Sequence, residues 1–132
     1  MDKSKLLAAQ ALAIQGIIYA PASFLLAPPQ QLEETCNGCG AADSWFRPPA
    51  KIYGTDIVAA CIVHDWMYGH GCTIEDKGEA DRTFFNNMIR LVERDKVKWY
   101  KPTHLQHRRV YKYYRAVDLF GGPAFWAGKN SV

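Results

Sequence analysis

The stretch that decides how this chain is interpreted is Cys61-Ile62-Val63-His64-Asp65-Trp66-Met67-Tyr68. On an α-helix, positions 61, 64, 65 and 68 stand at i, i+3, i+4 and i+7, so their side chains share one face. That face carries a thiol, an imidazole, a carboxylate and a phenol. It is either an unusually polar packing surface or an active site on a rigid helix, with His64 as a general base and Asp65 as a ligand for a hard cation.

The surrounding sequence predicts a mostly helical chain. We expect a first helix over residues 4–20, which are rich in Ala, Leu and Ile, and Pro21 would end it. Pro28-Pro29 would then begin an extended linker. Residues 36–54 hold three Gly and two Pro and are expected to form a loop. No segment shows the alternating pattern of a half-buried strand.

Three further helices are expected after this loop. One begins at Thr55 or Asp56 as its N-cap and runs to about Tyr68, where Gly69 and Gly71 would end it. The next runs from Glu75 to Arg94, and the last from Pro102-Thr103 to about Leu119, closed by Gly121-Gly122-Pro123. The helix from Glu75 has an apolar stripe at helical spacing, made of Ala80, Phe84, Met88, Leu91 and Val92.

A length of 132 residues predicts a single domain over residues 1–132. Its 48% hydrophobic and 22% charged residues are ordinary for a globular protein and argue against disorder. Residues 1–30 are expected to form an apolar N-terminal helix of the fold. The alternative is a signal segment with Ala20-Pro21-Ala22 as its cleavage motif.

The net charge of +3 is unevenly distributed. Residues 1–93 hold 7 basic and 11 acidic side chains, whereas residues 94–115 hold 8 basic and 1 acidic. The basic stretch also holds five aromatic residues, which are Trp99, Tyr100, Tyr111, Tyr113 and Tyr114. Such a mixture fits a membrane interface or phosphates with stacked bases, and it equally fits aromatic residues that pack inward under a solvated helix face. We expect an anionic partner.

Four cysteines lie within a segment of 37 residues: Cys36, Cys39, Cys61 and Cys72. An even count in a small domain is compatible with two disulfides in an oxidising compartment, and equally with a metal site. The sequence leaves all three disulfide pairings open.

The short connector between the two central helices requires them to lie antiparallel. The level of His64, near the end of the first helix, then meets the level of Asp81 in the second. A carboxylate on one imidazole nitrogen fixes the tautomer and leaves the other nitrogen free to take a proton. The alternative is that Asp81 only complements the helix dipole.

Asp65 points about 100° away from His64 around the helix and needs a different partner. The loop Cys36-Asn37-Gly38-Cys39-Gly40-Ala41-Ala42 is a candidate, because its small residues let backbone carbonyls turn inward. Hard cations such as calcium bind carbonyl and carboxylate oxygens. The alternative is a plain Gly-rich turn.

These residues together resemble the secreted phospholipase A2 superfamily, in particular its compact prokaryotic and phage-like branch. The resemblance covers residues 36–92: the Cys-Gly loop, Cys61 before His64-Asp65-x-x-Tyr68, and Asp81 in the following helix. It implies an all-α fold, in which two antiparallel disulfide-linked helices and a calcium-binding loop are flanked by N- and C-terminal helices. It leaves residues 1–30 and 100–132 uncovered.

The resemblance also implies a function for each site residue. His64 would activate water, anchored by Tyr68 and Asp81. Calcium would be bound by Asp65 with carbonyls near Gly38, Gly40 and Ala42, and the Gly40 N–H would help hold the oxyanion.

The activity implied is calcium-dependent hydrolysis of glycerophospholipids. From the basic stretch 94–115 we expect the partner to be a membrane or vesicle surface, preferably anionic, and not nucleic acid. A disulfide between Cys39 and Cys61 would tie the loop to the catalytic helix, and Cys36 with Cys72 is the remaining pair. The expected location is secreted or extracellular, with virion-associated or cytoplasmic as alternatives. No serine lies in a nucleophile-elbow motif, so a serine esterase is not expected.

Two functions without catalysis remain as alternatives. Cys36-x-x-Cys39 followed by Cys61-x-x-His64 has the spacing of a structural zinc site, with His70 and Cys72 as further ligands. This hypothesis leaves Asp65, Tyr68 and Asp81 unexplained. The other alternative is a module that binds an anionic surface or nucleic acid through residues 94–115.

Overall fold

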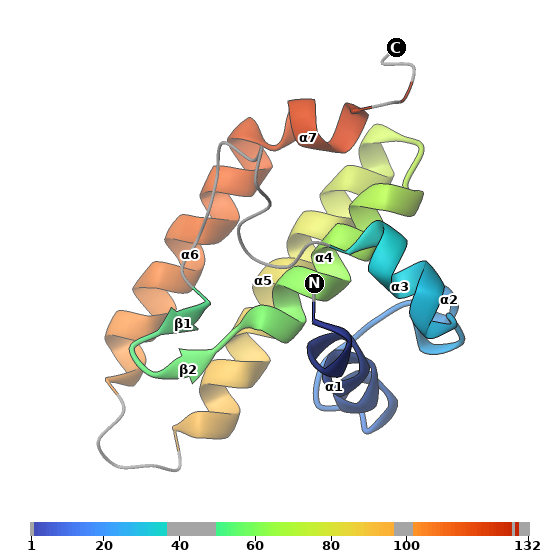
Figure 1. Ribbon diagram of the computed structural model, residues 1–132. Helices are drawn as coiled ribbons and strands as arrows, with labels where there is room; N and C mark the ends of the chain where they lie inside the picture. The colour runs from blue at the N-terminus through green and yellow to red at the C-terminus, as the bar shows by residue number, and fades with distance from the viewer. Residues whose placement is uncertain (1, 37–49, 97–101, 128, 130–132) are drawn as a thin grey trace.

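The computed structural model describes residues 2–36, 50–96, 102–127 and 129. These residues form seven helices and one two-stranded sheet (Figure 1). In chain order the elements are α1 (Lys3–Ile14), α2 (Ala22–Leu25), α3 (Pro29–Thr35), β1 (Lys51–Ile52), β2 (Thr55–Asp56), α4 (Val58–His70), α5 (Ile74–Asp95), α6 (Thr103–Phe120) and α7 (Gly122–Trp126). The prediction of a mostly helical chain is confirmed.

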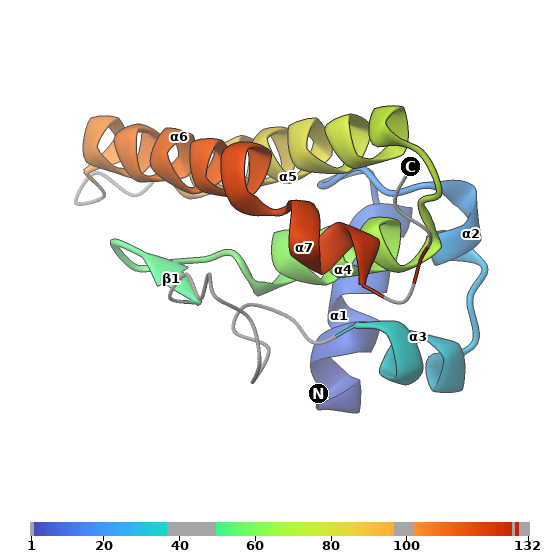
Figure 2. The ribbon, with the colours of Figure 1, turned by 90° about the horizontal axis from the view of Figure 1, so that it is seen from above.

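The long helices pack in the order α6, α5, α4, α1, so that α5 lies between α6 and α4 (Figures 1 and 2). The five predicted stripe residues of α5 are all buried where it meets its neighbours. Figure 2 shows α7 leaving the end of α6 and crossing toward the end of α4, which it contacts. None of the described helices is both long and apolar enough to span a membrane.

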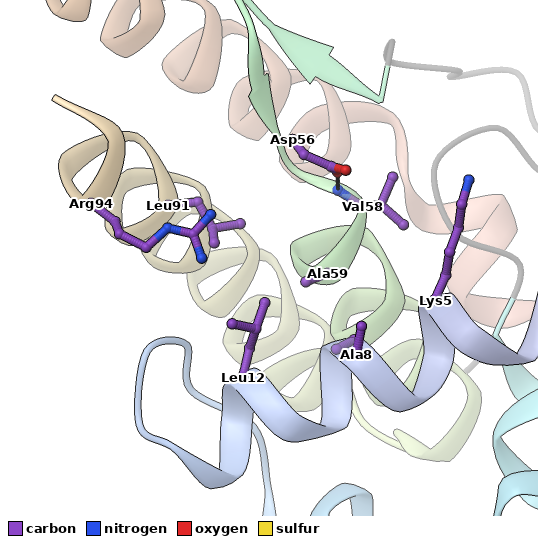
Figure 3. Close-up of a pocket in the computed structure, with 9 residues that line it drawn as sticks. Lys5, Ala8, Leu12, Asp56, Val58, Ala59, Leu91 and Arg94 are labelled. Carbon is purple, nitrogen blue, oxygen red and sulfur yellow. Dashed lines mark hydrogen bonds between the residues drawn. The ribbon is translucent and has the colours of Figure 1, made fainter. Parts of the chain in front are cut away.

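The ends of α4 and α5 follow from local hydrogen bonds. The N-cap of α4 is Ile57, which makes no side-chain cap hydrogen bond, so the prediction of Thr55 or Asp56 as the N-cap is wrong. The Asp56 carboxylate, one residue earlier, still accepts the Val58 N–H at 2.8 Å (Figure 3). Gly69 lies inside α4, and Gly71 is its C-cap. Thr73 and Asp76 form a capping box at the start of α5, in which each side chain accepts the other residue's backbone N–H. Only residues 71–73 connect the two helices, which makes them antiparallel.

The N-terminal third differs from its prediction in two places. The first helix ends at Ile14 rather than residue 20, because the chain turns at Gly16, whose φ of +78° suits glycine. Pro28-Pro29 does not begin an extended linker. Pro29 is instead the first residue of α3, where the missing N–H of proline costs no hydrogen bond. Leu6, Phe24 and Leu32 bring all three N-terminal helices into the core.

The strands β1 and β2 were not predicted and form a hairpin, in which β1 lies in the expected loop and β2 at the two positions expected to cap the next helix. Lys51 pairs with Asp56, and Ile52 with Thr55. The two turn residues, Tyr53 and Gly54, have φ of +47° and +87°, as a tight hairpin of this kind requires. The strands are two residues each, too short for an alternating pattern to appear in the sequence.

Candidate active site

Asp81 is the centre of a buried polar cluster between α4 and α5. Its side chain has no exposed surface. One carboxylate oxygen, Oδ1, lies 2.9 Å from His64 Nε2 and accepts the Tyr68 hydroxyl at 2.7 Å. The other oxygen, Oδ2, accepts the Lys77 ammonium at 2.7 Å. The structure therefore brings together three residues predicted from the sequence and adds Lys77, which was not predicted.

The imidazole of His64 contacts two aromatic rings. The Tyr68 ring centroid lies 4.1 Å from that of His64, and the Phe84 centroid lies 4.7 Å away. His64 is 8% exposed. Its Nε2 faces Asp81, so Nδ1 is the ring nitrogen that does not face this carboxylate.

The charge state of the cluster follows from its hydrogen bonds. Burial alone would raise the pKa of Asp81, but hydrogen bonds from His64, Lys77 and Tyr68 outweigh it, and the pKa lies below its usual value. Burial lowers the pKa of His64, and the Asp81 carboxylate offsets only part of this effect. Since an ionised carboxylate only accepts hydrogen bonds, the His64 proton must sit on Nε2, which leaves a lone pair on Nδ1.

The tyrosine in the cluster acts as a hydrogen-bond donor. Burial and the neighbouring Asp81 carboxylate raise the pKa of Tyr68 far above its usual value, so the hydroxyl keeps its proton. The α7 helix holds the ring in place, because Phe125 packs against it edge-on at 5.2 Å. The Lys129 ammonium binds the Tyr68 carbonyl oxygen. The C-terminal segment, which the family resemblance left uncovered, thus forms one wall of the site.

Asp65 lies half-buried on α4, beside the start of the loop expected to bind calcium. The buried Cys36 thiol donates to the Ile62 carbonyl oxygen at 3.5 Å, which fixes this end of the loop against α4. Burial and, to a smaller extent, the negative charge of Asp65 raise the pKa of Cys36 to about 12, so the thiol keeps its proton. The expected loop residues Gly38, Cys39, Gly40 and Ala42 lie outside the described residues.

Two of the four cysteines are free thiols: Cys36, which is buried, and Cys72, which is exposed. The expectation that these two pair with each other is therefore wrong. Cys61 is not a free thiol. Its predicted bond to Cys39 stays a prediction. Within the described ranges no three His, Cys, Asp or Glu side chains form a group that could hold a metal ion, but the zinc hypothesis also involves Cys39.

The helix of the basic stretch, α6, has an exposed side that carries charges and an opposite side that packs inward. Along α6, exposed side chains at helical spacing include Arg108, Tyr111, Lys112 and Arg115. On the opposite side Tyr113 is buried, and Tyr114 packs against Phe85 with ring centroids 5.1 Å apart. Two of the three described aromatic residues of the stretch therefore pack inward, and the charges remain in solvent.

A hollow of about 160 Å³ lies between α1, the start of α4 and the end of α5 (Figure 3). Its walls are mainly apolar, and Lys5, Asp56 and Arg94 lie among its lining residues. Neither His64 nor Asp81 lines it. It is therefore separate from the polar cluster.

Comparison with protein-family models, curated proteins and solved structures gave no match. The function is therefore argued from the residues and their geometry.

Proposed function

We propose that this protein hydrolyses the ester bond of glycerophospholipids, at the sn-2 position, and releases a fatty acid and a lysophospholipid. The observation that carries this proposal is the 2.9 Å contact between His64 Nε2 and an Asp81 oxygen that also accepts the Tyr68 hydroxyl. A histidine oriented in this way is a general base, because its Nδ1 lone pair is free for a proton.

In the proposed reaction, His64 Nδ1 takes a proton from a water molecule while the water oxygen attacks the ester carbonyl carbon. The bond from that carbon to the glycerol oxygen then breaks, and His64 returns its proton to the leaving oxygen. Asp81 stabilises the imidazolium between these two steps, and Tyr68 holds Asp81 in place. No side chain forms a covalent bond to the substrate.

One described side chain next to His64 supports a calcium ion as the cofactor. Asp65 offers a hard carboxylate on the helix turn that carries His64, and Cys36, the first residue of the Gly-rich loop, donates its thiol to the Ile62 carbonyl oxygen on the same helix. We propose that Asp65 and the carbonyls of Gly38, Gly40 and Ala42 would hold the ion, with the Gly40 N–H as an oxyanion donor. When bound, calcium would supply a Lewis acid at the ester carbonyl oxygen.

The proposed link between the loop and the catalytic helix is a disulfide from Cys39 to Cys61. In its support, Cys61 is not a free thiol, whereas Cys36 and Cys72 are. Such a bond would preorganise the loop beside Asp65. It also suits the proposed secreted or extracellular location, where disulfides persist. Mass mapping of non-reduced peptides tests the pairing, and an unmodified Cys39 thiol would rule it out.

The direct test of the function is release of fatty acid from phospholipid vesicles, first with calcium and then with a chelator. We expect hydrolysis that requires calcium and that falls about 100-fold or more in His64→Gln, since general bases contribute roughly 10²–10⁴ in rate. His70→Gln is the matched control, because His70 lies on α4 outside the cluster and should keep wild-type activity. Undiminished hydrolysis by folded His64→Gln would end the proposal.

The calcium assignment has its own test. Asp65→Lys would place an ammonium where the cation is proposed to bind, and calorimetry should then detect no calcium binding at wild-type concentrations. Glu79→Lys, an exposed change of the same charge on α5, controls for the change in net charge. Calcium binding to Asp65→Lys at wild-type strength would show that Asp65 is not the ligand.

A further inference from the structure

Lys77 has an environment that is unusual for a lysine. It is 6% exposed, and the three donor sites of its ammonium are matched by three acceptors. These are Asp81 Oδ2 at 2.7 Å, the Val117 carbonyl at 3.1 Å and the Asp118 carbonyl at 3.3 Å. Lysine is almost never fully buried unless it is paired, because desolvating an ammonium is costly.

The two carbonyls that bind Lys77 belong to the last turn of α6. The Val117 carbonyl also accepts the Gly121 N–H at 2.9 Å. The last carbonyls of a helix carry the negative end of its dipole, so they bind a cation well. Lys77 therefore connects the end of α6 to Asp81, which is four residues further along α5. A methionine of similar length would fill the same space without burying a charge.

The two carboxylate oxygens of Asp81 bind different partners, which shows how Lys77 affects the site. Tyr68 and His64 both bind Oδ1, and Lys77 binds Oδ2. Without the ammonium, Oδ2 would be a buried anionic oxygen with no donor among the contacts described. The carboxylate would then rotate or take up a proton, and either change weakens its hold on the His64 ring.

The same end of α6 also lies against Tyr68, another residue that binds Asp81. A Cβ atom at Gly121, directly after α6, would lie 2.5 Å from the Tyr68 hydroxyl oxygen. Only a glycine lets the backbone approach this closely. The C-terminal end of α6 thus contacts both side chains that hold Asp81 against His64.

We propose that Lys77 is a positioning residue of the active site, which fixes Asp81 toward His64 by binding it to the C-terminal end of α6. It touches no substrate and acts only through Asp81. This inference rests on the proposed function for its effect on turnover, but its effect on the His64 tautomer is independent of the reaction catalysed.

The first experiment measures that tautomer by ¹⁵N NMR of the imidazole in the calcium-free protein, with His64→Gln used to assign the signal. In the wild type we expect a single tautomer protonated on Nε2. In Lys77→Met we expect a mixture of the two neutral tautomers, and in Lys77→Arg, which keeps the charge, a return to the Nε2 form. A lysine with only a structural role would lower thermal stability without changing the tautomer.

The second experiment measures hydrolysis of a dispersed monomeric phospholipid ester. Lys77→Met should lower kcat about 10- to 100-fold, as for other residues that orient a catalytic group, and leave KM nearly unchanged. Lys77→Arg should recover most of this loss. The matched control is Arg90→Met, which removes an exposed charge from α5 and should leave kcat unchanged.

The outcomes separate this inference from the proposed function. If the wild type hydrolyses no phospholipid but the tautomer responds to Lys77→Met, Lys77 positions Asp81 and the proposed function is wrong. If the tautomer stays on Nε2 and kcat is unchanged in folded Lys77→Met, the positioning role is wrong. Should Lys77→Met not fold, Lys77→Gln, which keeps a hydrogen-bond donor without the charge, is measured by the same two criteria.

Discussion

The buried cluster around Asp81 and the basic face of α6 both depend on charge, but the charges act in different ways. In the cluster, each charged or polar group has a defined partner at 2.7–2.9 Å, away from water. On α6, Arg108, Lys112 and Arg115 are exposed. A buried pair is sensitive to loss of one partner, whereas exposed charges add roughly independently and are screened by salt. The comparison predicts large, specific effects in the cluster and small, additive effects on α6.

The largest effect on stability should come from removing the centre of the cluster. Asp81→Leu would leave the Lys77 ammonium buried without its anion, and we expect a loss of about 3–5 kcal/mol in the free energy of unfolding. Urea denaturation measures this loss. In the double variant Lys77→Met/Asp81→Leu both charges are gone, so much of the stability should return, because apolar residues often replace a buried ion pair without cost. A double variant less stable than Asp81→Leu would contradict this account.

Protonation of Asp81 in acid should lower the free energy of unfolding less than Asp81→Leu does, because the protonated side chain keeps its shape. The pKa of Asp81 is lower in the folded state than its ordinary value of 3.8, so folding stabilises the ionised form. This stability is present above about pH 4 and is lost as the pH falls through the folded-state pKa. The free energy of unfolding of wild type should therefore fall more steeply below pH 4 than that of Asp81→Asn. Equal slopes would show that the Asp81 pKa is not lowered.

Close packing at the edge of the cluster should give the next effect. Gly121→Ala would place a methyl group 2.5 Å from the Tyr68 hydroxyl oxygen and the Val117 carbonyl oxygen, and we expect a cost of about 1–3 kcal/mol in thermal or urea unfolding. Gly122→Ala is the control, because a Cβ there has no neighbour within 4 Å. If both variants are as stable as wild type, the end of α6 does not press against Tyr68.

The two regions also differ in how much of them could be predicted from sequence. His64, Tyr68 and Asp81 could be placed together because helical spacing and a short connector leave one antiparallel arrangement. Lys77 was missed, although it precedes Asp81 by four residues on the same helix face as the apolar stripe. The acceptors that allow its burial include carbonyls 40 and 41 residues away. No local pattern predicts such a contact.

The flanking segments were harder to predict for a different reason. The expected helix extended to residue 20 because residues 17–20 are apolar, but the left-handed backbone at Gly16 ends α1 earlier. Pro28-Pro29 was interpreted as a linker, although proline also suits the first turn of a helix. In these places local sequence permits two structures, and packing of Phe24 and Leu32 into the core favours the one that forms.

The smallest effects per residue are expected on the basic face of α6. If the protein adsorbs to anionic lipid through this face, each cation contributes about 1 kcal/mol, or roughly fivefold in affinity. Changing Arg108, Lys112 and Arg115 to Gln one after another should therefore weaken binding to anionic vesicles in similar steps. Arg109 is kept, because its guanidinium carbon lies 5.7 Å from the Tyr53 ring centroid and supports the hairpin.

The design of this test separates adsorption from catalysis. Flotation or tryptophan fluorescence measures vesicle binding, and hydrolysis of a dispersed monomeric ester measures the cluster, which the α6 changes should leave untouched. Neutralising Lys3, Arg82 and Arg90, exposed on α1 and α5, makes the same change in net charge away from this face. We expect that control to bind vesicles more tightly than the α6 variant. The difference in binding between each triple variant and the wild type should shrink in high salt, because surface attraction is screened.

Equal loss of binding in the two triple variants would mean that overall charge, rather than the α6 face, attracts the protein to lipid. A parallel loss of monomer hydrolysis would mean instead that the exposed face and the buried cluster are energetically coupled through α6.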